Sequence, residues 1–212
     1  MLVGNDVVDL RDPESQPEAL HPRFDARVFS SGEREALGTS GSPHSLRWSF
    51  WAAKESAYKV AKKLNAAVRF MPRDFLVRPV AEGWALVLHE TGSFEVRLER
   101  TDEWVHAVAT PTSANGLSTH RSVGAGIEPL GAPGADASRT VRELARADLS
   151  SRMNLPPRLV RIAADRGIPV ALWRNLRLPV DLSLSHDGRF VAWAWRERVV
   201  PEGRRGFGGR LA

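Results

Sequence analysis

Three short stretches of this 212-residue chain carry side chains whose types and spacing could do chemistry. Asp6 lies in a glycine-led turn, and Glu55 stands four residues before Lys59. Far along the chain, Ser183-Leu184-Ser185-His186 ends an apolar run. Two carboxylates without cysteine suit a hard cation such as Mg²⁺, which usually shares its shell with substrate phosphates. Lysines beside that cation suit a pyrophosphate, so these residues indicate metal-assisted phosphoryl transfer.

The lysines are gathered around Glu55, whereas arginine carries the other positive charges. They are Lys54, Lys59, Lys62 and Lys63. A solvated helix face accepts arginine as readily as lysine, so the grouping favours a site for phosphate and metal. Each feature also has a structural explanation when taken alone. A Glu–Lys pair four residues apart is usually a surface pair worth about 0.2–0.5 kcal/mol; Asp6 could cap a turn, and the Ser-x-Ser-His run could satisfy local backbone groups.

The elements that must position these residues follow from the sequence pattern. Ser30 with Glu33 three residues later fits a capping box that opens a helix over about 32–37. A longer, alanine-rich helix over about 45–64 carries all the lysines. Three alternating segments joined by tight connections then predict an antiparallel meander; they are 84–89, 94–100 and 104–109.

The later part of the chain repeats this organisation. We predict a helix over 139–153, a strand over 159–163, a turn at 167–169, and a hairpin of 180–185 with 190–195 closed by 186–188. The matched alternation of the two hairpins predicts an α+β protein of two similar halves, each a small antiparallel sheet packed on helices, arranged as a pseudo-dimer. The predicted boundaries are 1–114 for the first half, 115–136 for a glycine- and proline-rich linker, 137–197 for the second half, and 198–212 for a flexible basic tail.

Composition limits the classes of function. The chain has no cysteine, which excludes a disulfide framework, a thiolate metal site and a cysteine nucleophile. It has no apolar run of the roughly 18 to 20 residues that span a bilayer and no signal-peptide pattern, so we expect a cytoplasmic protein outside the membrane. The formal net charge of +5 favours an acidic partner, although an arginine-rich genome would give the same charge.

The motifs resemble those of the 4′-phosphopantetheinyl transferases. Residues 4–6 are similar to that family's Gly-x-Asp motif, and residues 51–59 to its Trp-x-x-Lys-Glu-x-x-x-Lys motif. Residues 21–34 are similar to the small holo-acyl-carrier-protein synthases, and residues 183–186 to the family's Ser-x-Ser-His strand. In the long type of transferase the Ser-His half comes first, whereas here it comes second. The chain is therefore either a circularly permuted two-half transferase or a small synthase with a long insertion before its final hairpin.

The resemblance implies a role for each matching position. Asp6 and Glu55 would bind Mg²⁺ together with the pyrophosphate of coenzyme A, and Glu55 would also take the proton from the carrier-protein serine. Lys59 would neutralise charge on the transferring phosphate. Coenzyme A would be held between the halves by Lys54, Lys59, Lys62, Ser185 and His186. Three arginines could face the acidic helix of a carrier protein; they are Arg23, Arg27 and Arg34.

The chain departs from the family pattern at three places. The glycine-bearing segment after Lys59 is absent, so Lys62 or Lys63 is a candidate to hold phosphate in its place. Ile168 stands where a basic residue is common, which puts one contact to the 3′-phosphate in doubt. Val8 replaces the second acid of the long type, which leaves two carboxylates for the metal.

We predict Mg²⁺-dependent transfer of the 4′-phosphopantetheine arm from coenzyme A to a serine of an acidic acyl or peptidyl carrier protein, with release of adenosine 3′,5′-bisphosphate. The carrier could serve fatty acid, polyketide or nonribosomal peptide synthesis, and the pseudo-dimer favours a monomer. One alternative is a transferase-like protein that binds coenzyme A or a carrier without turnover. A nucleic-acid-binding protein is a weaker alternative, because only the charge and the arginine–glycine tail favour it.

Overall fold

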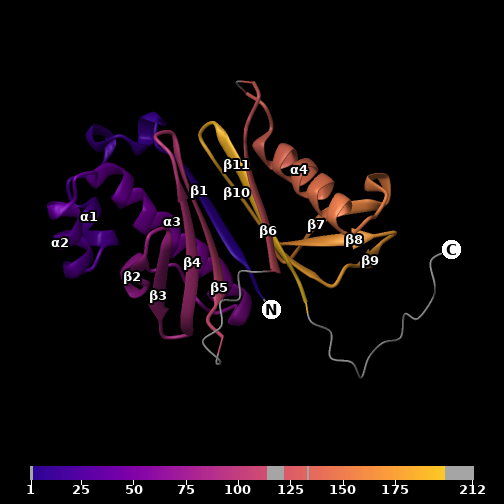
Figure 1. Ribbon diagram of the computed structural model, residues 1–212, viewed down its shortest axis with the longest axis horizontal. Helices are drawn as coiled ribbons and strands as arrows, with labels where there is room; N and C mark the ends of the chain where they lie inside the picture. Colours follow the sequence, from indigo (N-terminus) through magenta and orange to yellow (C-terminus); the bar gives the residue numbers. More distant parts are fainter. Residues whose placement is uncertain (1, 114–121, 133, 199–212) are drawn as a thin grey trace.

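The computed structural model describes residues 2–113, 122–132 and 134–198. These residues form three antiparallel sheets flanked by helices, so the fold class is α+β, as predicted. Figure 1 shows two bodies, an indigo-to-magenta one and an orange one, with strands β10 and β11 next to β1 where they meet. None of the described helices has the length and apolar character that crossing a membrane requires.

The first body is a five-stranded sheet covered by a long helix. The sheet has the order β1-β5-β4-β3-β2, and the helix α3 packs on it through small side chains such as Ala53 and Ala57, both fully buried. The predicted capping box is confirmed, because Ser30 and Glu33 exchange both hydrogen bonds at the start of α2. Its elements are β1 (Gly4–Asp9), α1 (Phe24–Val28), α2 (Ser31–Thr39), α3 (Pro43–Leu64), β2 (Leu76–Ala81), β3 (Trp84–His89), β4 (Gly92–Arg100) and β5 (Trp104–Pro111), with short 3-10 turns at Pro13–Ser15, Pro17–Ala19 and Pro72–Asp74.

The second body repeats this plan on a smaller scale. Helix α4 buries Val141, Ala145 and Leu149 against a three-stranded sheet of order β10-β11-β6. A second small sheet, of order β7-β8-β9, lies beside it. The elements are β6 (Val123–Pro129), α4 (Ala137–Arg152), a 3-10 turn at Pro157–Leu159, β7 (Val160–Asp165), β8 (Ile168–Trp173), β9 (Leu176–Arg177), β10 (Val180–Asp187) and β11 (Phe190–Glu197).

The two bodies share a topology that accounts for the predicted pseudo-dimer. Each begins with a strand, β1 or β6, continues into a long helix, α3 or α4, and ends in a hairpin, β4–β5 or β10–β11. In each, the first strand pairs antiparallel with the last strand of the hairpin. The exact limits of the two halves remain predictions.

Three local predictions are wrong. The linker predicted over 115–136 is a strand at residues 123–129, which pair with β11, while residues 114–121 and 133 lie outside the described part. The glycines that argued against a strand lie opposite Trp195 and Trp193, whose rings occupy the space that a Cβ at Gly124 or Gly126 would need.

The other two errors concern turns. Ile168 begins β8, so the turn is formed by Arg166 and Gly167, both with positive φ. The last hairpin is closed by residues 188–189, because β10 continues through Asp187. Most of the predicted basic tail, residues 199–212, lies outside the described residues.

The halves are joined at the outer edge of β1, which pairs with β5 on its other edge. Four backbone N–H groups, those of Val3 just before β1 and of three β1 residues, donate to side chains of β10 instead of to another strand: Val3 to Asp181 (2.8 Å), Asn5 to Ser183 (2.9 Å), Val7 to Ser185 (3.3 Å) and Asp9 to Asp187 (2.8 Å). The carbonyls on this edge accept from helix α3, Val3 from Lys63 and Asn5 from Lys59. We call these contacts the β1–β10 side-chain ladder.

Gly4 allows β1 to approach α3, and we expect its replacement to be costly. A Cβ at this position would lie 2.1 Å from the backbone oxygen of Ser56, which cannot move without the helix. Gly4→Ala should therefore lower the free energy of unfolding by about 2–3 kcal/mol, measured by urea denaturation.

Gly38 in α2 is the matched control, because nothing lies within 4 Å of a Cβ placed there. Gly38→Ala should raise the free energy of unfolding by about 0.5–1 kcal/mol, since alanine is the better helix former. Equal effects of the two substitutions would contradict the close approach of β1 to α3.

Candidate active site between the two halves

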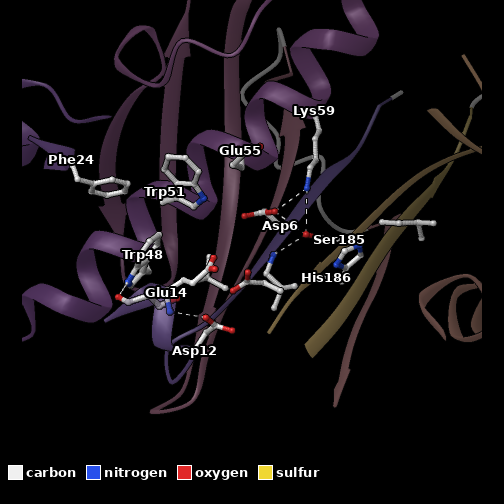
Figure 2. Close-up of a pocket in the computed structure, with 15 residues that line it drawn as sticks. Asp6, Asp12, Glu14, Phe24, Trp48, Trp51, Glu55, Lys59, Ser185 and His186 are labelled. Carbon is white, nitrogen blue, oxygen red and sulfur yellow. Dashed lines mark hydrogen bonds and ion pairs between the residues drawn. The ribbon is translucent and has the colours of Figure 1, made fainter. Parts of the chain in front are cut away.

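A cavity of about 470 Å³ opens where β1, α3 and β10 meet. Five of the predicted site residues line it, and they come from both halves of the chain (Figure 2). They are Asp6, Glu55, Lys59, Ser185 and His186.

Asp6 is held from two directions. Its carboxylate is largely buried, and its Oδ1 accepts hydrogen bonds from Lys59 Nζ (2.9 Å) and Ser185 Oγ (2.8 Å). Gly4 and Asp6 lie two residues apart on the same strand, so both face α3. The Gly-x-Asp spacing therefore combines close approach of the helix with a carboxylate at the cavity.

Glu55 has a different environment from Asp6. It lies one turn before Lys59 on α3, and no hydrogen bond from the described residues holds its carboxylate, whereas Lys59 and Ser185 both donate to Asp6. Burial, together with the negative charge of Asp6, raises the pKa of Glu55 to about 7, although Lys59 opposes the shift. A carboxyl group with this pKa can exchange a proton near neutral pH, as a general base must.

Lys59 joins three groups of the site. Its Nζ donates to the carbonyl of Asn5 at 2.8 Å and to Asp6, and lies 3.4 Å from Ser185 Oγ. The ammonium is partly exposed, with 27% of the side chain accessible. Lys59 therefore fixes the position of β1 and still presents positive charge to the cavity.

The two residues of the Ser-His pair have different surroundings. Ser185 is buried within the β1–β10 side-chain ladder, where it accepts from Val7 N and donates to Asp6. His186 is exposed and lines the cavity wall. Because successive strand residues point to opposite faces, the histidine is the member of the pair that is free to meet a ligand.

The donor set fits a hydrated divalent cation. Asp6 and Glu55 offer carboxylate oxygens to one cavity, and the Oδ2 of Asp6 accepts no hydrogen bond from the described residues. Within residues 2–113, 122–132 and 134–198, no three His, Cys, Asp or Glu side chains are grouped to hold a metal ion. Val8 is buried in the core next to α3 and adds no ligand. A two-carboxylate site of this kind suits Mg²⁺, which keeps several waters.

The prediction that Lys54 binds coenzyme A is wrong. Its side chain is fully buried, and its Nζ donates to Glu33 (2.9 Å) and to the carbonyls of Pro72 (3.0 Å) and Phe75 (2.5 Å). Lys54 thus has no donor left for a ligand and instead ties α2 and α3 to the chain before β2.

The structure does not bring Lys62 to the cavity either. Lys62 Nζ donates to the carbonyls of Ala66 and Val68, just after the end of α3. Lys63 is buried in an ion pair with Asp181 at 2.7 Å, within the β1–β10 side-chain ladder. Neither lysine replaces the missing glycine segment as a phosphate ligand in this arrangement.

Three arginines predicted to meet a carrier protein lie on the exposed surface of the first body. Arg23 and Arg27 flank Phe24, whose side chain lines the cavity, and Arg34 lies on α2. Of the two helices that carry Arg27 and Arg34, only α1 contributes a lining residue to the cavity, namely Phe24.

Sequence reasoning missed two groups of residues in the cavity. One is an aromatic wall of Phe24, Trp48 and Trp51, whose ring centroids lie 5.7–6.3 Å apart. The spacing of the two tryptophans, three residues apart on one helix, could have indicated it. The other is acidic and consists of Asp12, Glu14 and Asp187.

Asp187 illustrates the charge of this acidic rim. Burial, followed by the neighbouring charges of Asp6, Asp12 and Asp9, raises its pKa to about 6, although the backbone N–H of Asp9 opposes the shift. The cavity thus has several carboxylates near one lysine, and a cation placed among them would relieve their repulsion.

Two further cavities continue from the site along the second body. The first, of about 190 Å³, shares Leu184 and His186 with the main cavity and is also lined by Gly167 and Pro169. The second, of about 340 Å³, shares Ser138 and Arg142 with the first. It is bordered by four arginines, which are Arg139, Arg142, Arg146 and Arg161. The three cavities thus share lining residues one after another and form a groove, whose far end combines these arginines with Asp136 and Glu143.

Fold and site define a two-half α+β protein with an acidic, lysine-bearing cleft suited to phosphoryl chemistry. The family model of the 4′-phosphopantetheinyl transferase superfamily matches residues 2–109, half of the chain. The chain belongs to this superfamily, whose general activity is the transfer of phosphopantetheine.

Two solved structures are similar to parts of the chain. The holo-[acyl-carrier-protein] synthase of Neisseria meningitidis is 17% identical, with 53% of this chain and 100% of that chain covered and a TM-score of 0.44. The holo-[acyl-carrier-protein] synthase of Thermotoga maritima is also 17% identical, with 65% and 73% covered and a TM-score of 0.40. No curated protein matches the chain.

The raised pKa of Glu55 predicts a pH-dependent stability in metal-free buffer. Because the folded-state pKa of about 7 lies above the ordinary value of 4.5, the folded protein holds the extra proton between these values, and this stabilisation is lost as pH rises toward 7. Relative to Glu55→Gln, the free energy of unfolding of the wild type should fall by about 1–3 kcal/mol between about pH 5 and pH 8, measured by urea denaturation with a chelator present.

Glu35→Gln on the exposed face of α2 is the control, and it should leave the pH dependence of the wild type unchanged. If the difference between wild type and Glu55→Gln does not vary with pH, the pKa of Glu55 is not raised.

Proposed function

We propose that the protein transfers the 4′-phosphopantetheine arm of coenzyme A to a serine of a carrier protein, with Mg²⁺, and releases adenosine 3′,5′-bisphosphate. The observation that carries the proposal is the meeting of Asp6, Glu55 and Lys59 from the first half with His186 from the second half in one cavity of a chain of this superfamily. Such a cavity offers groups for a cation, a proton and a phosphate at once.

The surroundings of each residue in the site favour a different role for it. Asp6 and Glu55 would hold Mg²⁺, which when bound neutralises charge on the pyrophosphate. Glu55 would also accept the proton of the carrier serine, directly or through a water. Lys59, already beside Asp6, would stabilise the negative charge that develops on the transferring phosphate.

The groove gives the other end of coenzyme A a place to bind. His186 stands where the main cavity joins the next one, and Gly167 and Pro169 line that junction without bulky side chains. Beyond it, Arg142 donates to the Ser138 carbonyl, and the Nε of Arg146 is buried with no partner among the described residues. We propose that these guanidinium groups bind the 3′-phosphate. They would replace the basic residue that is common in the family at the position of Ile168.

The carrier protein would approach from the side of the first two helices. Arg23, Arg27 and Arg34 are exposed there, whereas Asp12 and Asp187 line the cavity itself. An acidic carrier is attracted by the first surface and repelled by the second, which would orient its serine toward Glu55.

Transfer can be tested by incubating the protein with coenzyme A, Mg²⁺ and apo acyl or peptidyl carrier proteins, followed by mass spectrometry of the carrier. The wild type should add one arm to at least one carrier, and a chelator should stop the reaction. Glu55→Gln should lower the rate by about 10²–10⁴-fold, because it removes both a metal ligand and the base.

The control is Glu35→Gln, which changes an exposed carboxyl of α2 and should transfer like the wild type. Modification that continues unchanged in Glu55→Gln, or that is insensitive to chelation, would contradict the proposed mechanism.

The arginine end of the groove gives a separate prediction. Arg142→Ala should raise the KM for coenzyme A about tenfold, the loss of one charge-assisted contact, but leave the KM for dephospho-coenzyme A unchanged. Arg152→Ala is the control, because Arg152 lies at the far end of the same helix, paired with Asp148. Equal effects of Arg142→Ala on both substrates would place the 3′-phosphate elsewhere.

A second candidate function is binding of coenzyme A without turnover. It is favoured because two candidate phosphate ligands are engaged elsewhere: Lys62 donates to a backbone carbonyl and Lys63 to Asp181. Among the described residues, Lys59 is then the lysine that lines the main cavity. Calorimetry that detects coenzyme A binding, together with no transfer to any carrier, would support this function over the transferase.

A further inference from the structure

We propose that Ser185 is a positioning residue that holds the Asp6 carboxylate and Lys59 in place, and that it does not contact coenzyme A. The inference rests on the proposed function, because it concerns the metal end of the same site. It assigns to the second half of the chain a direct part in shaping the metal ligand that the first half supplies.

The hydrogen-bonding capacity of Ser185 is used within the protein. A serine hydroxyl has one proton to donate and two lone pairs to accept with. The proton goes to Asp6 Oδ1 at 2.8 Å, and the lone pairs face Val7 N at 3.3 Å and Lys59 Nζ at 3.4 Å. Although Ser185 lines the cavity with 8% of the residue exposed, its donor proton and both lone pairs are already engaged by groups of the protein.

These contacts fix one oxygen of Asp6 and leave the other available. Oδ1 is held by Lys59 from α3 and by Ser185 from β10, two contacts that approach from different halves. The carboxylate therefore cannot rotate freely, and Oδ2 keeps one orientation. Residues that orient a metal ligand in this way typically change metal affinity by about 10–100-fold when they are removed.

Ser183 is a natural control for this role. It lies two residues earlier on β10, is buried to 3% exposure, and accepts the backbone N–H of Asn5 at 2.9 Å. It therefore makes the same kind of ladder contact to β1 as Ser185, but among the described residues it forms no hydrogen bond with Asp6 or Lys59. Loss of the Ser185 hydroxyl removes three contacts and should cost more stability than loss of the Ser183 hydroxyl, and only loss of the Ser185 hydroxyl should disturb the metal ligand.

Of the Ser-His pair, His186 is the residue that would contact coenzyme A. It lies on the opposite face of β10 from Ser185, is exposed, and lines both the main cavity and its continuation toward Gly167. Strand alternation therefore gives the two residues different roles: the Ser185 hydroxyl bonds within the ladder, and the His186 side chain faces the groove.

The test measures binding of Mn²⁺ by electron paramagnetic resonance, with neither coenzyme A nor carrier present. Ser185→Ala should weaken Mn²⁺ binding about tenfold, whereas Ser183→Ala should stay within about twofold of the wild type. Urea denaturation should show both variants folded, with a loss of about 0.5–1.5 kcal/mol for Ser183→Ala and of about 1.5–3 kcal/mol for Ser185→Ala, which also loses a bond to a carboxylate. In calorimetry with coenzyme A and a chelator, Ser185→Ala should bind like the wild type, and His186→Ala should bind more weakly.

Several results would overturn the inference. These are wild-type Mn²⁺ affinity in Ser185→Ala, an equal loss in Ser183→Ala, weaker coenzyme A binding by Ser185→Ala without metal, or no Mn²⁺ binding by the wild type. The predicted pattern in a protein that modifies no carrier would instead uphold the positioning role and reject the transferase. Failure of the positioning role can therefore be distinguished from failure of the proposed transferase function.

Discussion

The structure depends on how the outer edge of β1 satisfies its backbone hydrogen bonds. An unpaired edge strand leaves a row of N–H and C=O groups that must find partners, and natural proteins rarely bury such a row without them. Here four N–H groups donate to the side chains of Asp181, Ser183, Ser185 and Asp187, and two carbonyls accept from Lys59 and Lys63. Because these partners come from β10 and α3, closing the edge of one sheet also assembles the two halves.

The outer edge of β1 also determines where Asp6 and its neighbours on the strand point. Along β1 the alternate residues Gly4, Asp6 and Val8 face α3: the first touches the helix, the second reaches the cavity and the third enters the core. Val3 and Val7 face the other way and pack against β11. A one-residue slip of β1 would exchange these faces and remove Asp6 from Lys59. The ladder, whose four N–H contacts each join residues 178 apart, fixes that register from outside the first half.

Sequence reasoning recovered the features that have a local signature. Alternation predicts β3, β4 and β5, and the Ser30–Glu33 spacing predicts the start of α2. It failed where the structure of a residue or strand depends on a partner that is distant in the sequence. Lys54 stands beside Glu55 in the sequence, but one residue rotates a helix by about 100°, so Lys54 faces the core and meets Glu33. Strand β6 was hidden by glycines that make room for tryptophans about seventy residues later.

The topology also bears on how the two halves came to stand in this order. An insertion before a final hairpin would require β10 and β11 to complete the first sheet. Instead β5 completes it by pairing with β1, and β10 and β11 form a separate sheet with β6. Contacts between the halves run from the edge of one strand to the side chains of another, so they do not require either half to come first in the chain. The topology is therefore that of two similar halves, each with its own sheet closed by its own hairpin, and the ladder joins the two sheets at the edge of β1.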